Sequence, residues 1–261
     1  MRHFLAFVML VVAGLSACAA TPETALPPTA SPPPTATVAP VVAAVPPALE
    51  PAIPALRLCA QTVGIPLAVL TVPQEAALPL AANLRLWWGD RPPPNMAAFP
   101  LGEEQLAVIA HQGNNLPTSA GGLWRIVTGQ VTTRLNNEGT PAPLTLWLPL
   151  AGSAEDARLS AWLGNASRRG DARLAPSPQA MLTAISNDPA AIGFLPAAWM
   201  HTAAAQVSAV QALPLPTPPA AWRAPVLVLL PPDAPPEARS LIACLQQGPG
   251  REALHEVYME R

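Results

Sequence analysis

The chain has 261 residues, of which 51% are apolar and only 11% are charged, and its formal net charge is −2. This length can bury one hydrophobic core of ordinary size or two small ones. The near-neutral balance and the lack of any run of basic residues argue against a nucleic-acid partner.

Residues 1–18 have the pattern of an export signal. A short polar head, RH, precedes an apolar core over residues 4–15 that is too short to span a bilayer as a permanent helix. The core ends in LSAC, which resembles the lipobox of bacterial lipoproteins and implies that Cys18 carries lipid. An ordinary secretory signal is the alternative, and both place the protein outside the cytoplasm.

Residues 19–55 are rich in alanine, proline and threonine, with almost no charge and no aromatic residue. Proline at this density blocks the hydrogen bonds of helix and sheet and favours an extended chain. We therefore predict a disordered linker over residues 19–55 and a folded domain over residues 56–261.

Short apolar runs and helical patterns alternate through the folded part. The expected strands are LRLCA, LRLWW, LAVIA, LTLWL, AAIGFL and PVLVLL, and the expected helices are GGLWRIVTG, SAEDARLSAWLG, SPQAMLTAIS and PPEARSLIACLQQ. This alternation predicts an α/β domain with mainly parallel sheets. Ser153, with Asp156 three residues on, is expected to cap its helix.

Two cysteines remain if Cys18 is lipidated. Cys59 and Cys244 would lie in an oxidising compartment, where they could form one disulfide. Two buried free thiols are the alternative, because sequence spacing does not show whether the Cα atoms approach each other.

The sequence does not predict an enzyme, a metal site or a cofactor. His3, His111, His201 and His255 are far apart and lack the spacing of zinc ligands. The AGSAE segment around Ser153 lacks the second glycine of a nucleophile elbow, and glycine-rich phosphate loops are absent.

Four blocks resemble, in order, segments of the phosphate-type substrate-binding proteins of ABC importers. They are LRLCAQTVGIPLAVL, EEQLAVIAHQGNNLPTSAGGLWRIVTGQVTTRL, PAAIGFLPAAW, and PVLVLL with the helices after it to Tyr258. The resemblance implies a type 2 periplasmic-binding-protein-like fold of two hinged α/β lobes. Lobe one would comprise residues 56–112 and 222–261, and lobe two residues 113–221. Lobe one is shortened, since only residues 71–83 stand where the family usually has another strand and helix.

The resemblance also implies a function. The chain would be a lipid-anchored, monomeric extracytoplasmic protein that captures a small ligand, such as the oxyanion phosphate, for import through an ABC permease. A surface sensory or scaffold module that keeps the fold with a degenerate ligand site is the alternative.

The resemblance places three ligand-binding segments on this sequence. Gln61 and Thr62 match polar residues after the first strand, with a polar helix cap as the alternative. Asp90, after LRLWWG, matches an aspartate that accepts a proton from the bound oxyanion, with a turn residue as the alternative.

The third segment begins at Ser153, which matches a family serine at a helix start. Ala154 and Glu155 follow where the family has glycine and threonine, and no arginine lies between residues 138 and 153. A guanidinium that binds an oxyanion would then come from Arg91, Arg125 or Arg134. These departures argue against tight phosphate binding.

Overall fold

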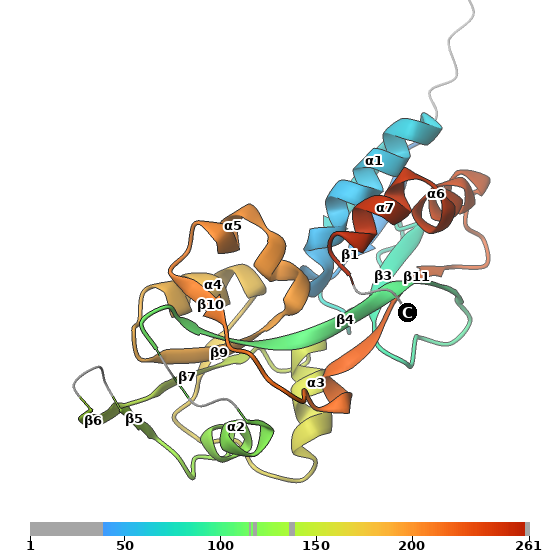
Figure 1. Ribbon diagram of the computed structural model, residues 1–261. Helices are drawn as coiled ribbons and strands as arrows, with labels where there is room; N and C mark the ends of the chain where they lie inside the picture. The colour runs from blue at the N-terminus through green and yellow to red at the C-terminus, as the bar shows by residue number, and fades with distance from the viewer. Residues whose placement is uncertain (1–38, 115, 117–118, 136–138, 259–261) are drawn as a thin grey trace, which may run out of the picture. The chain divides into compact units, whose positions relative to one another are not determined.

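The computed structural model describes residues 39–114, 116, 119–135 and 139–258 (Figure 1). The predicted signal segment, Cys18 and the linker as far as residue 38 lie outside the described residues. No helix in the described part of the chain has the length and apolarity needed to cross a membrane.

The folded part begins earlier than the sequence predicted. Residues assigned to the linker form strand β1 (Val41–Val45) and the 3-10 helix η1 (Pro47–Ala52), and they are largely buried. The prolines that suggested a linker flank the VVAAV run rather than interrupt it, and β-branched valines favour a strand. The predicted boundary at residue 56 is therefore wrong.

The LRLCA run is helical, and its assignment as the first strand is a second correction. It lies inside helix α1 (Ile53–Val63), which buries Leu56, Cys59 and Ala60 on one face, as helical spacing requires. Gly64 ends this helix in the left-handed conformation with φ of 74°. Strand β2 (Leu67–Thr71) follows and pairs with β1 in parallel.

Nine strands form one mixed sheet in the order β2-β1-β3-β11-β4-β9-β7-β8, with β10 also paired to β4. The further strands are β3 (Leu84–Trp88), β4 (Ala97–His111), β7 (Thr145–Pro149), β8 (Arg173–Ala175), β9 (Ala191–Pro196), β10 (Val210–Ala212) and β11 (Arg223–Leu230). The pairs β1-β2, β1-β3, β7-β8 and β7-β9 are parallel, as expected. The pairs β3-β11, β11-β4, β4-β9 and β4-β10 are antiparallel, so this sheet has as many antiparallel as parallel pairs, whereas the sequence predicted mainly parallel ones.

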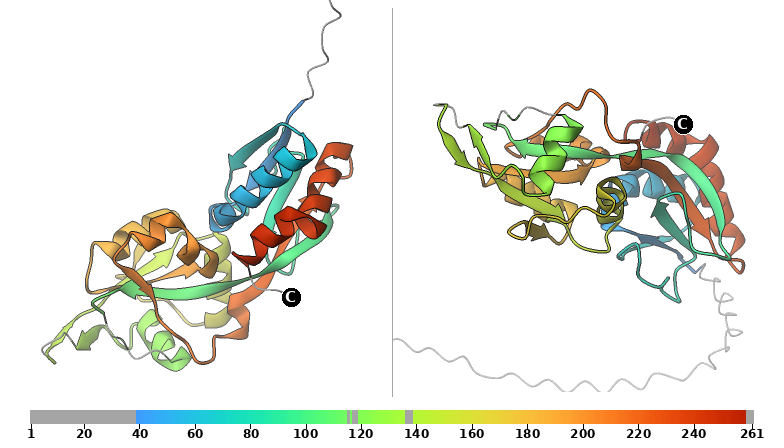
Figure 2. Two further views of the ribbon diagram at one scale, coloured as in Figure 1. Left: turned by 45° about the horizontal axis from the view of Figure 1, so that its top comes forward. Right: turned by 90° about the horizontal axis from the view of Figure 1, so that it is seen from below.

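The long strand β4 belongs to both halves of the sheet. Its first part pairs with β11 and its last part with β9 and β10. Figure 1 and Figure 2 show it running from the helices α1, α6 (Pro236–Gln247) and α7 (Pro249–His255) toward α4 (Pro178–Ser186) and α5 (Ala203–Gln206). This is a two-lobed α/β topology, and the lobe boundaries given above stay a prediction.

The remaining elements complete the second half. They are α2 (Ala120–Val127), α3 (Ala154–Leu163), the 3-10 helices η2 (Ala197–His201) and η3 (Ala220–Trp222), and the hairpin β5 (Thr133–Leu135) with β6 (Pro141–Pro143). The four predicted helices and five of the six predicted strands are confirmed. Serines cap three helices, since Ser119, Ser153 and Ser177 each accept a hydrogen bond from a backbone N–H.

Buried aromatic rings and one disulfide hold the elements together. Trp222 is fully buried and meets the rings of Phe194 and Trp162 edge to face, with centroids 5.7 and 5.0 Å away. Cys59 of α1 and Cys244 of α6 form a disulfide with a Cα–Cα distance of 5.6 Å. The bridge joins two helices, and its two cysteines are 185 residues apart in the sequence.

Candidate ligand-binding site

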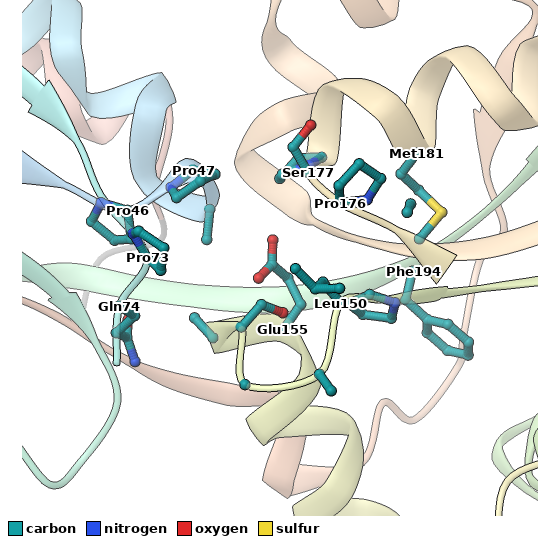
Figure 3. A pocket seen from close by; sticks show the side chains of 18 residues that line it. Pro46, Pro47, Pro73, Gln74, Leu150, Glu155, Pro176, Ser177, Met181 and Phe194 are labelled. Carbon is teal, nitrogen blue, oxygen red and sulfur yellow. The ribbon is translucent and has the colours of Figure 1, made fainter. Parts of the chain in front are cut away.

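A cavity of about 100 Å³ lies where four connecting segments and the starts of two helices meet (Figure 3). It is lined by residues 46–48, 73–74, 149–155 and 175–178, together with Met181 and Phe194. We call this cavity the α3–α4 pocket, since the first turns of these two helices form much of its wall.

The topology explains why these segments meet. Strands β7 and β8 are parallel neighbours, and their carboxyl ends lead into α3 and α4. Parallel strands bring such loops to one edge of the sheet, which is where ligands bind in open α/β folds. The end of β1 adds Pro46 and Pro47 from the other half of the sheet.

The start of α3 has the predicted cap. The Ser153 side chain accepts a hydrogen bond from the Asp156 backbone N–H at 3.1 Å, and the Asp156 carboxylate accepts one from the Gly152 N–H at 3.0 Å. Gly152 has φ of 79°, a conformation that favours glycine. Asp156 also forms an ion pair with Arg168.

Glu155 places a carboxyl group in the pocket. The residue is only 5% exposed, and Figure 3 shows its carboxyl group pointing into the cavity. Burial raises the pKa of this carboxyl, and the charge of Asp156 acts in the same direction. Hydrogen bonds from the Glu155 backbone and from Ser153 oppose that rise in pKa.

The opposite wall is fixed by two buried polar residues that the sequence analysis missed. Gln74 donates to the Trp88 carbonyl at 3.0 Å and accepts from the Trp88 N–H at 2.9 Å. Arg85 donates to the carbonyls of Pro73 and Ala76 at 3.1 and 2.6 Å. A charged residue inside the apolar run LRLWW was the signal in the sequence that could have found this support.

The wall is poor in hydrogen-bond donors. Six lining residues are proline, which has no backbone N–H: Pro46, Pro47, Pro73, Pro149, Pro176 and Pro178. The lining residues that the structure describes include no arginine, lysine or histidine. The pocket therefore differs from a site built to hold an oxyanion with guanidinium and amide donors.

Gln61 and Thr62 are not among the residues that line this pocket, and their predicted position after the first strand is wrong because they lie in α1. Both are exposed in the last turn of α1, and the Thr62 hydroxyl donates to the Leu58 carbonyl at 2.9 Å. The error follows from taking LRLCA as the first strand. The loop that follows the true first strand begins with Pro46 and Pro47.

Asp90 and the candidate arginines are not among the residues that line the α3–α4 pocket, and their role in ligand binding stays a prediction. Asp90 is exposed and pairs with Arg158 at 3.4 Å in a separate open depression that Arg91 also lines. Arg125 is exposed on α2, and Arg134 lies in β5. Ser153, Ala154 and Glu155 are thus the predicted residues that the structure brings together at the pocket.

No protein-family model and no curated protein sequence matches the chain. Several solved structures are similar to it in fold. A putative phosphate ABC transporter substrate-binding protein from Clostridium perfringens, solved with bound phosphate, has a TM-score of 0.71 at 13% identity and covers 85% of this chain and 99% of its own. An ABC-type phosphate transport receptor from Vibrio cholerae has a TM-score of 0.62 at 17% identity, covering 85% and 100%.

A regulatory protein is also similar. A reduced form of OxyR from N. meningitidis has a TM-score of 0.59 at 14% identity and covers 80% of this chain and 94% of its own. The fold of the described chain is therefore the one found in phosphate-binding proteins of ABC transporters, and OxyR has it too. Fold alone does not assign a ligand.

Proposed function

We propose that this protein is an extracytoplasmic solute-binding protein that captures a small ligand in the α3–α4 pocket and delivers it to an ABC permease. The observation that carries the proposal is a cavity at the ends of parallel strands with a buried carboxyl pointing into it. The similarity in fold to phosphate-binding proteins of ABC transporters supports the same role.

The proposal includes a lipid anchor at Cys18 that holds a monomer at the outer face of the cell membrane. The LSAC motif after a short apolar core supports this part. The disulfide between Cys59 and Cys244 fits the oxidising side of that membrane.

The proposed function does not specify the chemical class of the ligand. An oxyanion such as phosphate was expected from the resemblance, but the described lining residues offer it no basic side chain. The proposal therefore names a small ligand without assigning phosphate.

Thermal unfolding of the full chain in detergent, against a chemically mixed panel of small solutes, tests this function. A ligand that binds the native state raises the melting temperature. Ala151→Trp adds a ring at an exposed pocket position, and Ala203→Trp adds the same ring on α5 as a control. We expect at least one solute to stabilise the unmodified protein and the control, but not Ala151→Trp.

A sensory or scaffold module is the second candidate. The similarity to OxyR and the lack of a basic residue in the described pocket wall favour it. In that case no solute in the panel changes the melting temperature, and this result would overturn the transport proposal.

A further inference from the structure

The titratable side chains at and beside the α3–α4 pocket are mostly acids. Glu155 points into the cavity, and the groups that interact with it electrostatically, Asp156 and Glu104, are also acids. Arg168 approaches the same helix start, but its guanidinium is held by Asp156 and by the Ser160 hydroxyl at 2.6 Å. An anion entering the pocket would meet a carboxyl group with no free guanidinium among the described lining residues.

The first turns of α3 and α4 do not reverse this preference. A helix start attracts negative charge through its free backbone N–H groups. At α3, the side chains of Ser153 and Asp156 already accept hydrogen bonds from N–H groups of this turn and its preceding loop. At α4, Ser177 accepts from the Ala180 N–H at 3.2 Å, and Pro178 has no N–H.

The prolines disfavour an anion. The six prolines in the wall offer a ligand no backbone N–H. The carbonyl oxygens of Pro46, Pro47 and Pro73 already accept hydrogen bonds within the protein, whereas the Glu155 carboxyl points into the cavity as an acceptor. A buried carboxylate is stable only when an opposite charge or several donors accompany it. A ligand with a positive charge and several N–H groups supplies both, whereas an oxyanion supplies no positive charge.

We infer that the α3–α4 pocket binds a small primary ammonium ligand, whose charged group pairs with the Glu155 carboxylate and whose aliphatic part contacts the prolines, Leu150 and Phe194. The inference rests on the proposed solute-binding function and names its ligand class. The cavity of about 100 Å³ is smaller than the roughly 300–1,000 Å³ typical of pockets for drug-sized ligands, so the ligand is a small one.

The test uses matched probes on the full chain in detergent at constant ionic strength. Ethylammonium, propylammonium and butylammonium are the cations, acetate and phosphate are the anions, and ethanol is the neutral probe. Near saturation we expect the alkylammonium ions to raise the melting temperature by roughly 2–5 °C, with no rise from the other probes. Stabilisation by acetate or phosphate without stabilisation by the alkylammonium ions would overturn the inference.

The variant Glu155→Gln keeps the shape of the side chain and removes its charge. We expect alkylammonium affinity to fall at least about tenfold, because the ion pair is lost. Glu237→Gln makes the same change in the first turn of α6, outside the pocket, and should bind like the unmodified protein. Unchanged affinity in Glu155→Gln would also overturn the inference.

The two proposals fail differently. If a solute of another class binds and Ala151→Trp blocks it, the ammonium inference is wrong and the solute-binding function stands. If no solute in either panel stabilises the protein, both are wrong.

Discussion

The indole Nε1 of Trp199 donates a hydrogen bond to the carbonyl oxygen of Pro47 at 3.2 Å, although the two residues are 152 positions apart. Pro47 lines the α3–α4 pocket and follows β1, while Trp199 lies in η2 after β9. The bond therefore fixes a pocket wall from one half of the sheet against a buried helix of the other half.

Trp199→Phe tests that contact. The variant keeps an aromatic ring in the core and removes the donor, so the free energy of unfolding should fall by roughly 1–3 kcal/mol. Urea unfolding measures this change. Trp124→Phe makes the same change at a half-buried position of α2 and is the control. It should lower the free energy of unfolding by less than Trp199→Phe does. Equal losses in the two variants would show that the Pro47 contact contributes nothing specific.

Glu104 makes stability depend on pH. Burial is the main cause that raises its pKa from 4.5 to about 8, against the opposing hydrogen bonds from the backbone of Gln105, Ala198 and Ala197. A raised pKa means that the native state holds the proton more tightly than the unfolded state. The contribution to stability is complete below pH 4.5 and is lost as pH rises through about 8.

Glu104→Gln should flatten this dependence. Between pH 5 and pH 8 the unmodified protein should lose up to about 4 kcal/mol from this group, and the variant should lose less. Urea unfolding at both pH values measures the difference. Because Glu155 has a pKa raised by burial as well, some slope in the same direction remains in the variant. An unchanged slope would contradict the assignment to Glu104.

The disulfide should contribute strongly to stability. Bridging Cys59 and Cys244 closes a loop across 185 residues, and a crosslink of that length restricts the unfolded chain. We expect the double variant Cys59→Ala, Cys244→Ala to lose roughly 2–5 kcal/mol of unfolding free energy. Denaturant unfolding with and without a reductant provides the control, since only the unmodified protein should respond to reduction.

Gly193 leaves room for the side chain of Met181 beside the pocket. A Cβ at residue 193 would lie 2.6 Å from the Met181 sulfur and 3.2 Å from Ile185 Cδ1. Gly193→Ala should therefore cost about 1–3 kcal/mol of stability through overpacking. Gly121→Ala is the matched control, because a Cβ there meets nothing within 4 Å. Thermal unfolding of both variants measures the difference. Similar melting temperatures for Gly193→Ala and Gly121→Ala would contradict the packing argument.

Much of the fold was predictable because the local signals agreed. Ser153 and Ser177 stand before helical patterns, and runs such as PVLVLL between turn residues form buried strands. The failure at LRLCA has a physical reason, since a five-residue apolar run fits both a strand and one face of a helix. The prolines around β1 then concealed the true first strand.

The candidate site was predictable only in part, because it is assembled from distant segments. The start of α3 was predicted correctly because Ser153 and Asp156 have the spacing of a helix cap. The Pro73–Gln74 wall depends on Arg85 and on hydrogen bonds to Trp88, which no local pattern reveals. Gln61 and Thr62 were misplaced because their position depended on the wrong first strand.

Strand β4 has a consequence for how the protein unfolds. Its 15 residues pair with β11 in one half of the sheet and with β9 and β10 in the other. Neither half can lose this strand without exposing the edge of the other half. The two halves should therefore unfold in one cooperative transition, with the β4 amides that pair with β11 and those that pair with β9 protected from hydrogen exchange to the same degree.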